Sequence, residues 1–169
     1  MRLHSARVPQ IAAEMVSALR QSGDIETQSP KEVQLDIEAV LNQYVRDEQE
    51  ISERAKDLLA ARGLAQSEYA KLRRLIADER QIKLGDDAID YLLDQLIEML
   101  MHSANVEEIF VEDVSLRRKM REPLRRQAAE EEQLQAEVRS QLKHVKEGTS
   151  LWEIEYRRMM DDIKRRKGL

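Results

Sequence analysis

Residues 29–63 read SPKEVQLDIEAVLNQYVRDEQEISERAKDLLAARG, and they hold the clearest helical pattern in the chain. Ser29 is suited to cap a helix, Pro30 to its first position and Glu32 to the third, where it completes a capping box. The apolar residues that follow recur every three or four positions, as on one face of a helix. No glycine or proline interrupts them before Gly63. The stretch therefore predicts one helix of about 32 residues, roughly 48 Å long.

Further helical patterns lie on both sides of this stretch. The same spacing predicts helices over about 8–21 and 67–81, a fourth that carries the apolar residues from Ile89 to Leu100, and others over about 112–145 and from 150 onward. Asp86 or Asp87 is expected to cap the fourth helix and Ser150 the last. No strand pattern appears, and at most Arg2-Leu3 pairs with Lys83-Leu84 as a two-residue ribbon.

The second half of the chain repeats the first. The offset is 81 residues for Ser22 and Ser103 and for Val33 and Val114, 83 for later matches such as Ile51 and Leu134, and 84 in the last helix. We predict an internal duplication, with one three-helix repeat at 1–81 and a second at 82–169. Two unrelated helical hairpins are the alternative.

Pro123 lies where the offset grows by two. A proline inside a helix removes a hydrogen bond and clashes with the preceding turn. We therefore expect two inserted residues there and a broken or bent helix near Glu122. The predicted fold class is all-α: an elongated helical protein made of two duplicated three-helix units with long central helices.

Composition excludes several classes of function. The chain has 169 residues, of which 36% are charged and 4% aromatic, and a net charge of −5. It has no cysteine, so disulfides, thiolate catalysis and cysteine-bound zinc are excluded. The N-terminal residues lack the apolar core of a signal peptide, and no stretch approaches the roughly 20 apolar residues of a membrane span. We expect a cytoplasmic protein with no membrane partner.

No catalytic, cofactor or metal site is predicted. His4, His102 and His144 have no second histidine or paired carboxylate at metal-ligand spacing, and no Glu-x-x-His pair or Gly-rich phosphate loop occurs. The acidic residues Glu48 and Glu131 interrupt the apolar stripes of the two long helices. We expect the middle of each long helix to be exposed to solvent, with a polar contact to the other copy or to a partner as the alternative.

Two basic runs are the strongest charge signals. Arg117, Arg118, Arg121 and Arg125 share a helix face within the run at 117–126, and Lys164 and Arg165 begin the run at 164–167. Such clusters bind phosphate backbones, or they pair with acidic faces of the same protein.

The aromatic pair Trp152 and Tyr156 lies at i and i+4 of the last helix. We expect the pair to pack in a core, and an aromatic anchor for a partner is the alternative.

Several segments resemble a known family. They are Ile89-Asp90-Tyr91, Gln95-Leu96-Ile97, Val106-Glu107-Glu108, the stretch from Asp113 to Met120, and Leu151-Trp152-Glu153-Ile154-Glu155-Tyr156-Arg157. Together they resemble the bacterial domain-of-unknown-function family 507 over essentially the whole chain. The resemblance implies no activity, ligand or functional residue.

By subtraction, the sequence predicts a non-enzymatic interaction or scaffold protein that uses helical surfaces. Its partner would be another protein, or a second copy of itself in a homo-oligomer. The alternative is RNA or DNA binding through the basic runs at 117–126 and 164–167.

Overall fold

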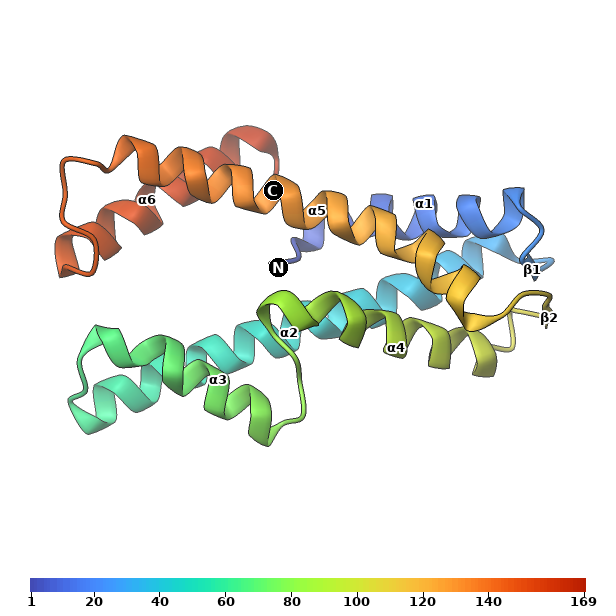
Figure 1. The fold of residues 1–169 in the computed structure, drawn as a ribbon, viewed down its shortest axis with the longest axis horizontal. Helices are drawn as coiled ribbons and strands as arrows, with labels where there is room; N and C mark the ends of the chain where they lie inside the picture. Colours follow the sequence, from blue (N-terminus) through green and yellow to red (C-terminus); the bar gives the residue numbers. More distant parts are fainter. The chain divides into compact units, whose positions relative to one another are not determined.

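The computed structural model describes every residue from Met1 to Leu169, and the fold is all-α apart from one pair of two-residue strands. The helices are α1 (Val8–Gln21), α2 (Pro30–Arg62), α3 (Tyr69–Glu79), α4 (Ala88–His102), α5 (Asp113–Gln141) and α6 (Ser150–Lys167) (Figure 1). Short 3-10 turns at Ser5–Arg7, Gln66–Glu68 and Gly85–Asp87 precede α1, α3 and α4. The predicted all-α class is confirmed. None of the helices combines the length and apolar character that crossing a membrane requires.

The chain forms two compact units, each drawn from both halves of the sequence. Unit 1 comprises Met1–Arg46 and Gly85–Ala128, and unit 2 comprises Asp47–Leu84 and Ala129–Leu169. Helices α2 and α5 each supply their first part to unit 1 and the remainder to unit 2. The two units are defined by which residues pack together, and they do not coincide with the two halves of the sequence. The sequence repeat over 1–81 and 82–169, and the duplication it implies, stay predictions.

Unit 1 packs the apolar faces of α1, α4 and the first parts of α2 and α5. These faces form because leucine, isoleucine and methionine recur at helical spacing, and each fully buried side chain contributes about 1.5–3 kcal/mol. The fully buried side chains of the unit include Met15, Leu19, Ile37, Leu41, Leu92, Leu93, Leu96, Leu100, Leu116 and Met120. Tyr44 on α2 and Tyr91 on α4 meet with ring centroids 6.0 Å apart.

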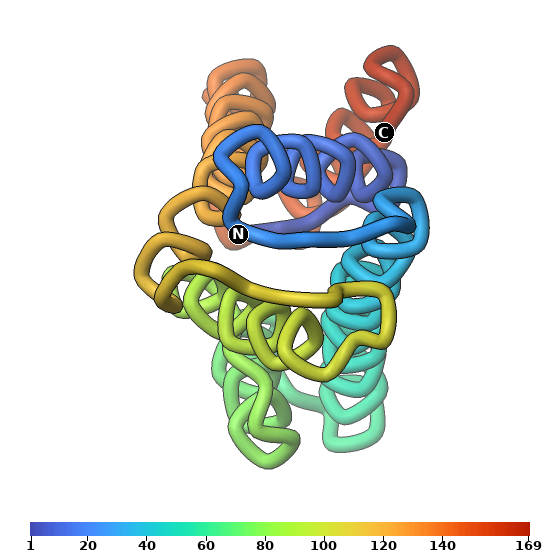
Figure 2. Tube along the Cα trace, turned by 90° about the vertical axis from the view of Figure 1, so that its right-hand side faces the viewer, coloured from blue at the N-terminus to red at the C-terminus, as the bar shows by residue number.

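A two-stranded ribbon joins the α1–α2 connection to the α4–α5 connection, which cross the front of Figure 2 in blue and yellow. Strands β1 (Ile25–Glu26) and β2 (Glu108–Ile109) are antiparallel, with Ile25 opposite Ile109 and Glu26 opposite Glu108. The ribbon predicted at Arg2-Leu3 and Lys83-Leu84 is wrong. Strands of two residues are too short for alternation to reveal them.

Unit 2 contains two helical hairpins with separate apolar clusters. Ala55 and Leu59 of α2 pack with Leu72 of α3. The end of α5 packs on α6 through a larger cluster, which consists of Leu134, Val138, Leu142, Trp152, Met160 and Ile163. Helix α6 is capped by Thr149, whose hydroxyl accepts a hydrogen bond from the Trp152 N–H at 3.2 Å. The predicted cap at Ser150 is therefore one residue late, and Asp87 occupies the cap position of α4 without a side-chain bond.

The buried positions of α2 recur 83 residues later, in α5 and at Leu142 just beyond its end. The pairs are Val33 and Leu116, Ile37 and Met120, Leu41 and Leu124, Tyr44 and Gln127, Glu48 and Glu131, Ile51 and Leu134, Ala55 and Val138, and Leu59 and Leu142. The predicted match of Val33 with Val114 is wrong, because Val33 is fully buried whereas Val114 is 72% exposed.

Pro123 lies inside α5, which continues unbroken on both sides of it. The predicted break near Glu122 is wrong, whereas the bend predicted as its alternative stays a prediction. The change of offset does not occur at Pro123 either. The offset is already 83 at Leu116, whereas it is 81 between Ile11 of α1 and Leu92 of α4, all of them buried. The change of offset from 81 to 83 therefore falls between α4 and Leu116, ahead of Pro123, and an insertion in the α4–α5 connection would disturb no helix.

Candidate functional site

Most of the basic run on α5 is engaged by acidic residues of the same unit. Arg117 contacts Asp94 at 2.6 Å and Arg121 contacts Asp90 at 2.5 Å, both on α4. Arg126 contacts Glu14 of α1 at 2.6 Å. The run thus attaches α5 to the polar edges of α4 and α1. Exposed ion pairs of this kind contribute about 0–1 kcal/mol each.

Lys119 makes the most buried of these contacts. Its ammonium donates to the Asp24 carboxylate and to the Ser22 hydroxyl, beyond the end of α1. The Asp24 side chain is only 3% exposed, and the Lys119 side chain 23%. A carboxylate so far from water needs a charged partner, so Lys119 has a structural task here.

Arg118 and Arg125 are the exposed members of the run and form no ion pair. They lie seven residues, or about two turns, apart, and so share one face of α5. Glu122, also exposed, lies between them on that face. Of the four arginines singled out from the sequence, only these two are free to meet a phosphate.

The C-terminal basic run forms the last turn of α6. Arg165 is 80% exposed and has a weak contact with Asp162 at 3.9 Å, and Lys164 is partly buried. Cations at this end of a helix interact favourably with its dipole, which is a local reason for the run.

Trp152 and Tyr156 belong to the core of their hairpin. Trp152 is 8% exposed and packs with Leu134, Val138 and Leu142. Its ring stacks on Tyr156 with centroids 4.8 Å apart. The core interpretation is confirmed for Trp152, and Tyr156 is partly buried against the same cluster.

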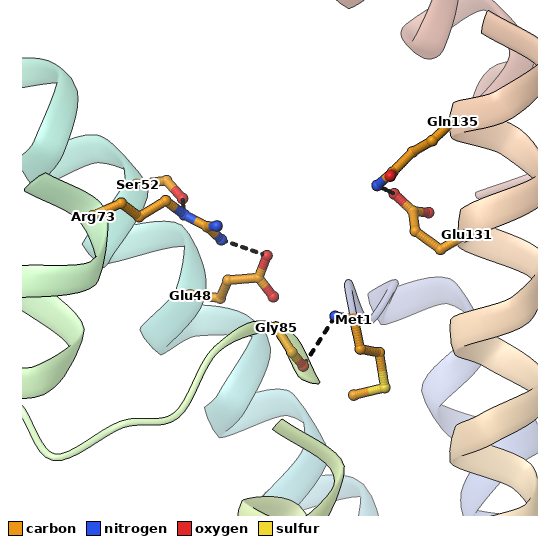
Figure 3. Close-up of polar contacts among 7 residues, drawn as sticks. All are labelled: Met1, Glu48, Ser52, Arg73, Gly85, Glu131 and Gln135. Carbon is orange, nitrogen blue, oxygen red and sulfur yellow. Dashed lines mark hydrogen bonds and ion pairs between the residues drawn. The ribbon is translucent and has the colours of Figure 1, made fainter. Parts of the chain in front are cut away.

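The middle of each long helix is not exposed, which corrects our expectation. Glu48 is 8% exposed and Glu131 is 3% exposed. In Figure 3, Arg73 of α3 reaches Glu48 at 3.0 Å and Ser52 at 3.0 Å, and Gln135 donates to Glu131 at 3.5 Å. A polar residue in an apolar stripe is buried here because other side chains supply its hydrogen bonds.

The same helix α3 carries a second arginine that binds α2. Arg80 contacts Asp47 at 3.2 Å and Glu50 at 3.0 Å. In unit 1, the amine of Met1 donates to the Gly85 carbonyl at 3.3 Å, also drawn in Figure 3. These contacts join α3 to α2 and the N-terminus to the turn that precedes α4.

The three histidines lie on different segments: His4 before α1, His102 at the end of α4 and His144 between α5 and α6. His102 contacts Glu98 on the same helix at 3.1 Å, where both are largely exposed, and His4 is buried. No group of three or more histidine, aspartate or glutamate side chains lies close enough to hold a metal ion.

Sequence reasoning missed one surface, at β2 and the start of α5. Phe110, the only phenylalanine, is 56% exposed and Val114 is 72% exposed. The segment 107–113 holds four acids and no base, and all four acids are exposed. In the sequence, these four acids around one aromatic residue were the signal that could have indicated this surface.

Comparison with known proteins places the chain in a family. The family model described as "Protein of unknown function (DUF507)" matches residues 1–169, the whole chain. The search of curated proteins found no match. The chain therefore belongs to the DUF507 family, as the resemblance of its sequence implied.

Proposed function

We propose that this chain is a non-enzymatic interaction protein that acts in the cytoplasm and binds another protein through its surface. The observation that carries the proposal is a contrast within unit 1. Cationic side chains of α5 are engaged internally, while large apolar side chains are left in water. Exposed apolar groups gain free energy when a partner covers them, at about 25 cal/mol per Å².

Not every exposed apolar residue supports this proposal, because single ones are normal on protein surfaces. The large apolar residues that are exposed are Leu35, Leu64, Leu75, Met101, Phe110, Val114, Leu151 and Ile154. Phe110 and Val114 stand out because they are more than half exposed and only four residues apart. Leu151 and Ile154 on α6, also more than half exposed and three residues apart, form a second pair.

Nucleic-acid binding is the second candidate, and the exposed pair Arg118 and Arg125 favours it. Phosphate binding releases counterions, so affinity for mixed RNA or DNA would fall steeply between about 50 and 200 mM salt. With two free arginines we expect only weak binding. A salt-dependent complex that the Arg118→Ala/Arg125→Ala variant loses would favour this candidate over the first.

Affinity capture tests the proposal. The tagged full-length chain is incubated with extract of the source organism, with and without nuclease, and retained proteins are identified and then tested in purified form. We expect one protein to remain after nuclease and to bind directly when purified. Capture that disappears with nuclease, or no direct binding, contradicts the proposal. Sedimentation of the purified chain shows whether that protein is a second copy.

A further inference from the structure

We infer that the outer face of the β1–β2 ribbon docks a segment of another protein that carries lysine or arginine beside apolar side chains. This inference rests on the proposed function and names the surface and the chemistry of its partner. The face consists of Glu26, Glu108, Phe110 and Val114, and we call it the ribbon face. All four residues are exposed.

The register of the ribbon places its acids together. Glu26 lies directly opposite Glu108, and Ile25 directly opposite Ile109. Directly opposite residues have Cβ atoms about 4.5–5.5 Å apart and point to the same side of the ribbon. Ile25 is buried and Ile109 half-buried, so this pair marks the inner face. Glu26 and Glu108 therefore point outward as a like-charged pair.

Phe110 belongs to the same side. Successive side chains of an extended segment alternate, so residues 108 and 110 share a face. Phe110 directly follows β2 and its N–H donates to the Asp24 carbonyl at 2.9 Å, so the backbone pairing of the two connections reaches Phe110. The ribbon face thus combines the exposed Phe110 with two exposed carboxylates of the ribbon, and Val114 is only four residues further along the chain.

The fold itself does not require this combination. Thr27 follows β1 as Phe110 follows β2, and Lys31 is the second residue of α2 as Val114 is of α5. Thr27 donates to the Asn105 carbonyl at 2.6 Å, a role that Phe110 cannot fill. The same turn is therefore built once from polar residues and once from exposed apolar ones.

The carboxylates have no cation within the protein. Neither Glu26 nor Glu108 forms an ion pair, and the segment 103–116 contains no lysine, arginine or histidine. Glu112 and Asp113 have a local role at the positive end of α5, but Glu26 and Glu108 do not. Like charges directly opposite one another destabilise a ribbon. A basic group from a partner would relieve that repulsion, and its apolar neighbours would cover Phe110 and Val114.

Fluorescence anisotropy with synthetic peptides tests the ribbon face. The probes are labelled amphipathic helices of about 14 residues, four turns, with one leucine face and either lysine or glutamate elsewhere. We expect the full-length chain to bind the lysine peptide at least tenfold more tightly than the glutamate peptide. The double variant Phe110→Thr/Val114→Lys carries the side chains of the other turn and should lose at least tenfold in affinity. Leu35→Thr and Asp57→Asn, which remove exposed groups elsewhere, should bind as the wild type does.

The variant Glu108→Lys separates a loss of peptide binding from a loss of stability. A lysine opposite Glu26 forms a cross-strand ion pair, so the melting temperature should rise by about 1–3 °C while peptide binding is lost. A fall in melting temperature, equal affinity for both peptides, or full binding by Phe110→Thr/Val114→Lys overturns the inference. So does a wild-type dimer that this double variant abolishes, since the occupant would then be a second copy. A captured protein that binds all these variants equally leaves the proposed function standing and removes the ribbon face from it.

Discussion

The guanidinium of Arg73 lies 3.0 Å from the carboxylate of Glu48, which interrupts the apolar stripe of α2. The Glu48 side chain is 11% exposed and that of Arg73 is 29% exposed. The contact joins α3 to α2 within unit 2, beside the cluster of Ala55, Leu59 and Leu72. An acidic residue at this position therefore belongs to the packing of the hairpin.

Removing this carboxylate should be costly. We expect Glu48→Ala to lower the free energy of unfolding by about 1–3 kcal/mol, because Arg73 then lacks its charged partner at a partly buried site. Glu50→Ala is the control, since Glu50 is 60% exposed and pairs with Arg80 at the surface. It should cost no more than about 1 kcal/mol. Urea denaturation measures both, and equal losses would show that Glu48 has no special role.

Two neighbouring residues of the basic run on α5, Lys119 and Arg118, should differ in their contribution to stability. Lys119→Ala strands the Asp24 carboxylate, which is 3% exposed, and should cost about 2–3 kcal/mol. Arg118→Ala removes an exposed side chain that forms no ion pair and should change stability by less than about 0.5 kcal/mol. Thermal unfolding of the two variants measures both changes in stability. A similar change in both would indicate that the whole basic run is solvated and that Lys119 has no structural role.

Two leucines of α2 differ in burial, so their substitution tests the packing of unit 1. Leu41 is fully buried, whereas Leu35 is 44% exposed. Leu41→Asp buries an unpaired charge and should unfold the protein or cost more than about 4 kcal/mol. Leu35→Asp should leave the circular dichroism spectrum unchanged. If Leu41→Asp folds with wild-type stability, the packing of unit 1 described above is incorrect.

Replacing Pro123 by alanine should stabilise the protein. It lies inside an unbroken helix, where proline costs up to about 3 kcal/mol relative to alanine. Pro123→Ala restores the missing N–H but buries less apolar surface, so we expect a net gain of about 1 kcal/mol. Chemical denaturation measures it. A loss of stability would indicate that the proline sets a bend on which the surrounding core depends.

The helices were predictable from the sequence, and their polar partners were not. The bounds of α1 and α2 follow from apolar periodicity and from Pro9, Pro30 and Gly63. The burial of Glu48 depends on Arg73, 25 residues away in the chain, and periodicity carries no information about such a partner.

The alignment of the two halves was wrong at its early matches in the long helices, for a related reason. It matched Val33 with Val114 by residue type, but one is buried and the other exposed.

The ribbon face was missed because two-residue strands leave no periodic signal. The exposed Phe110 looks like a core residue until its surroundings are known.

Capture experiments with two double variants test the central claim most directly. Phe110→Thr/Val114→Lys alters the ribbon face, and Arg118→Ala/Arg125→Ala removes the exposed arginines of α5. With nuclease-treated extract and matched amounts of folded bait, we expect the first variant to lose the protein that the wild type retains and the second to keep it. The opposite result, with the partner retained by the first variant and lost by the second, would contradict the claim that this chain binds a protein through its exposed apolar side chains.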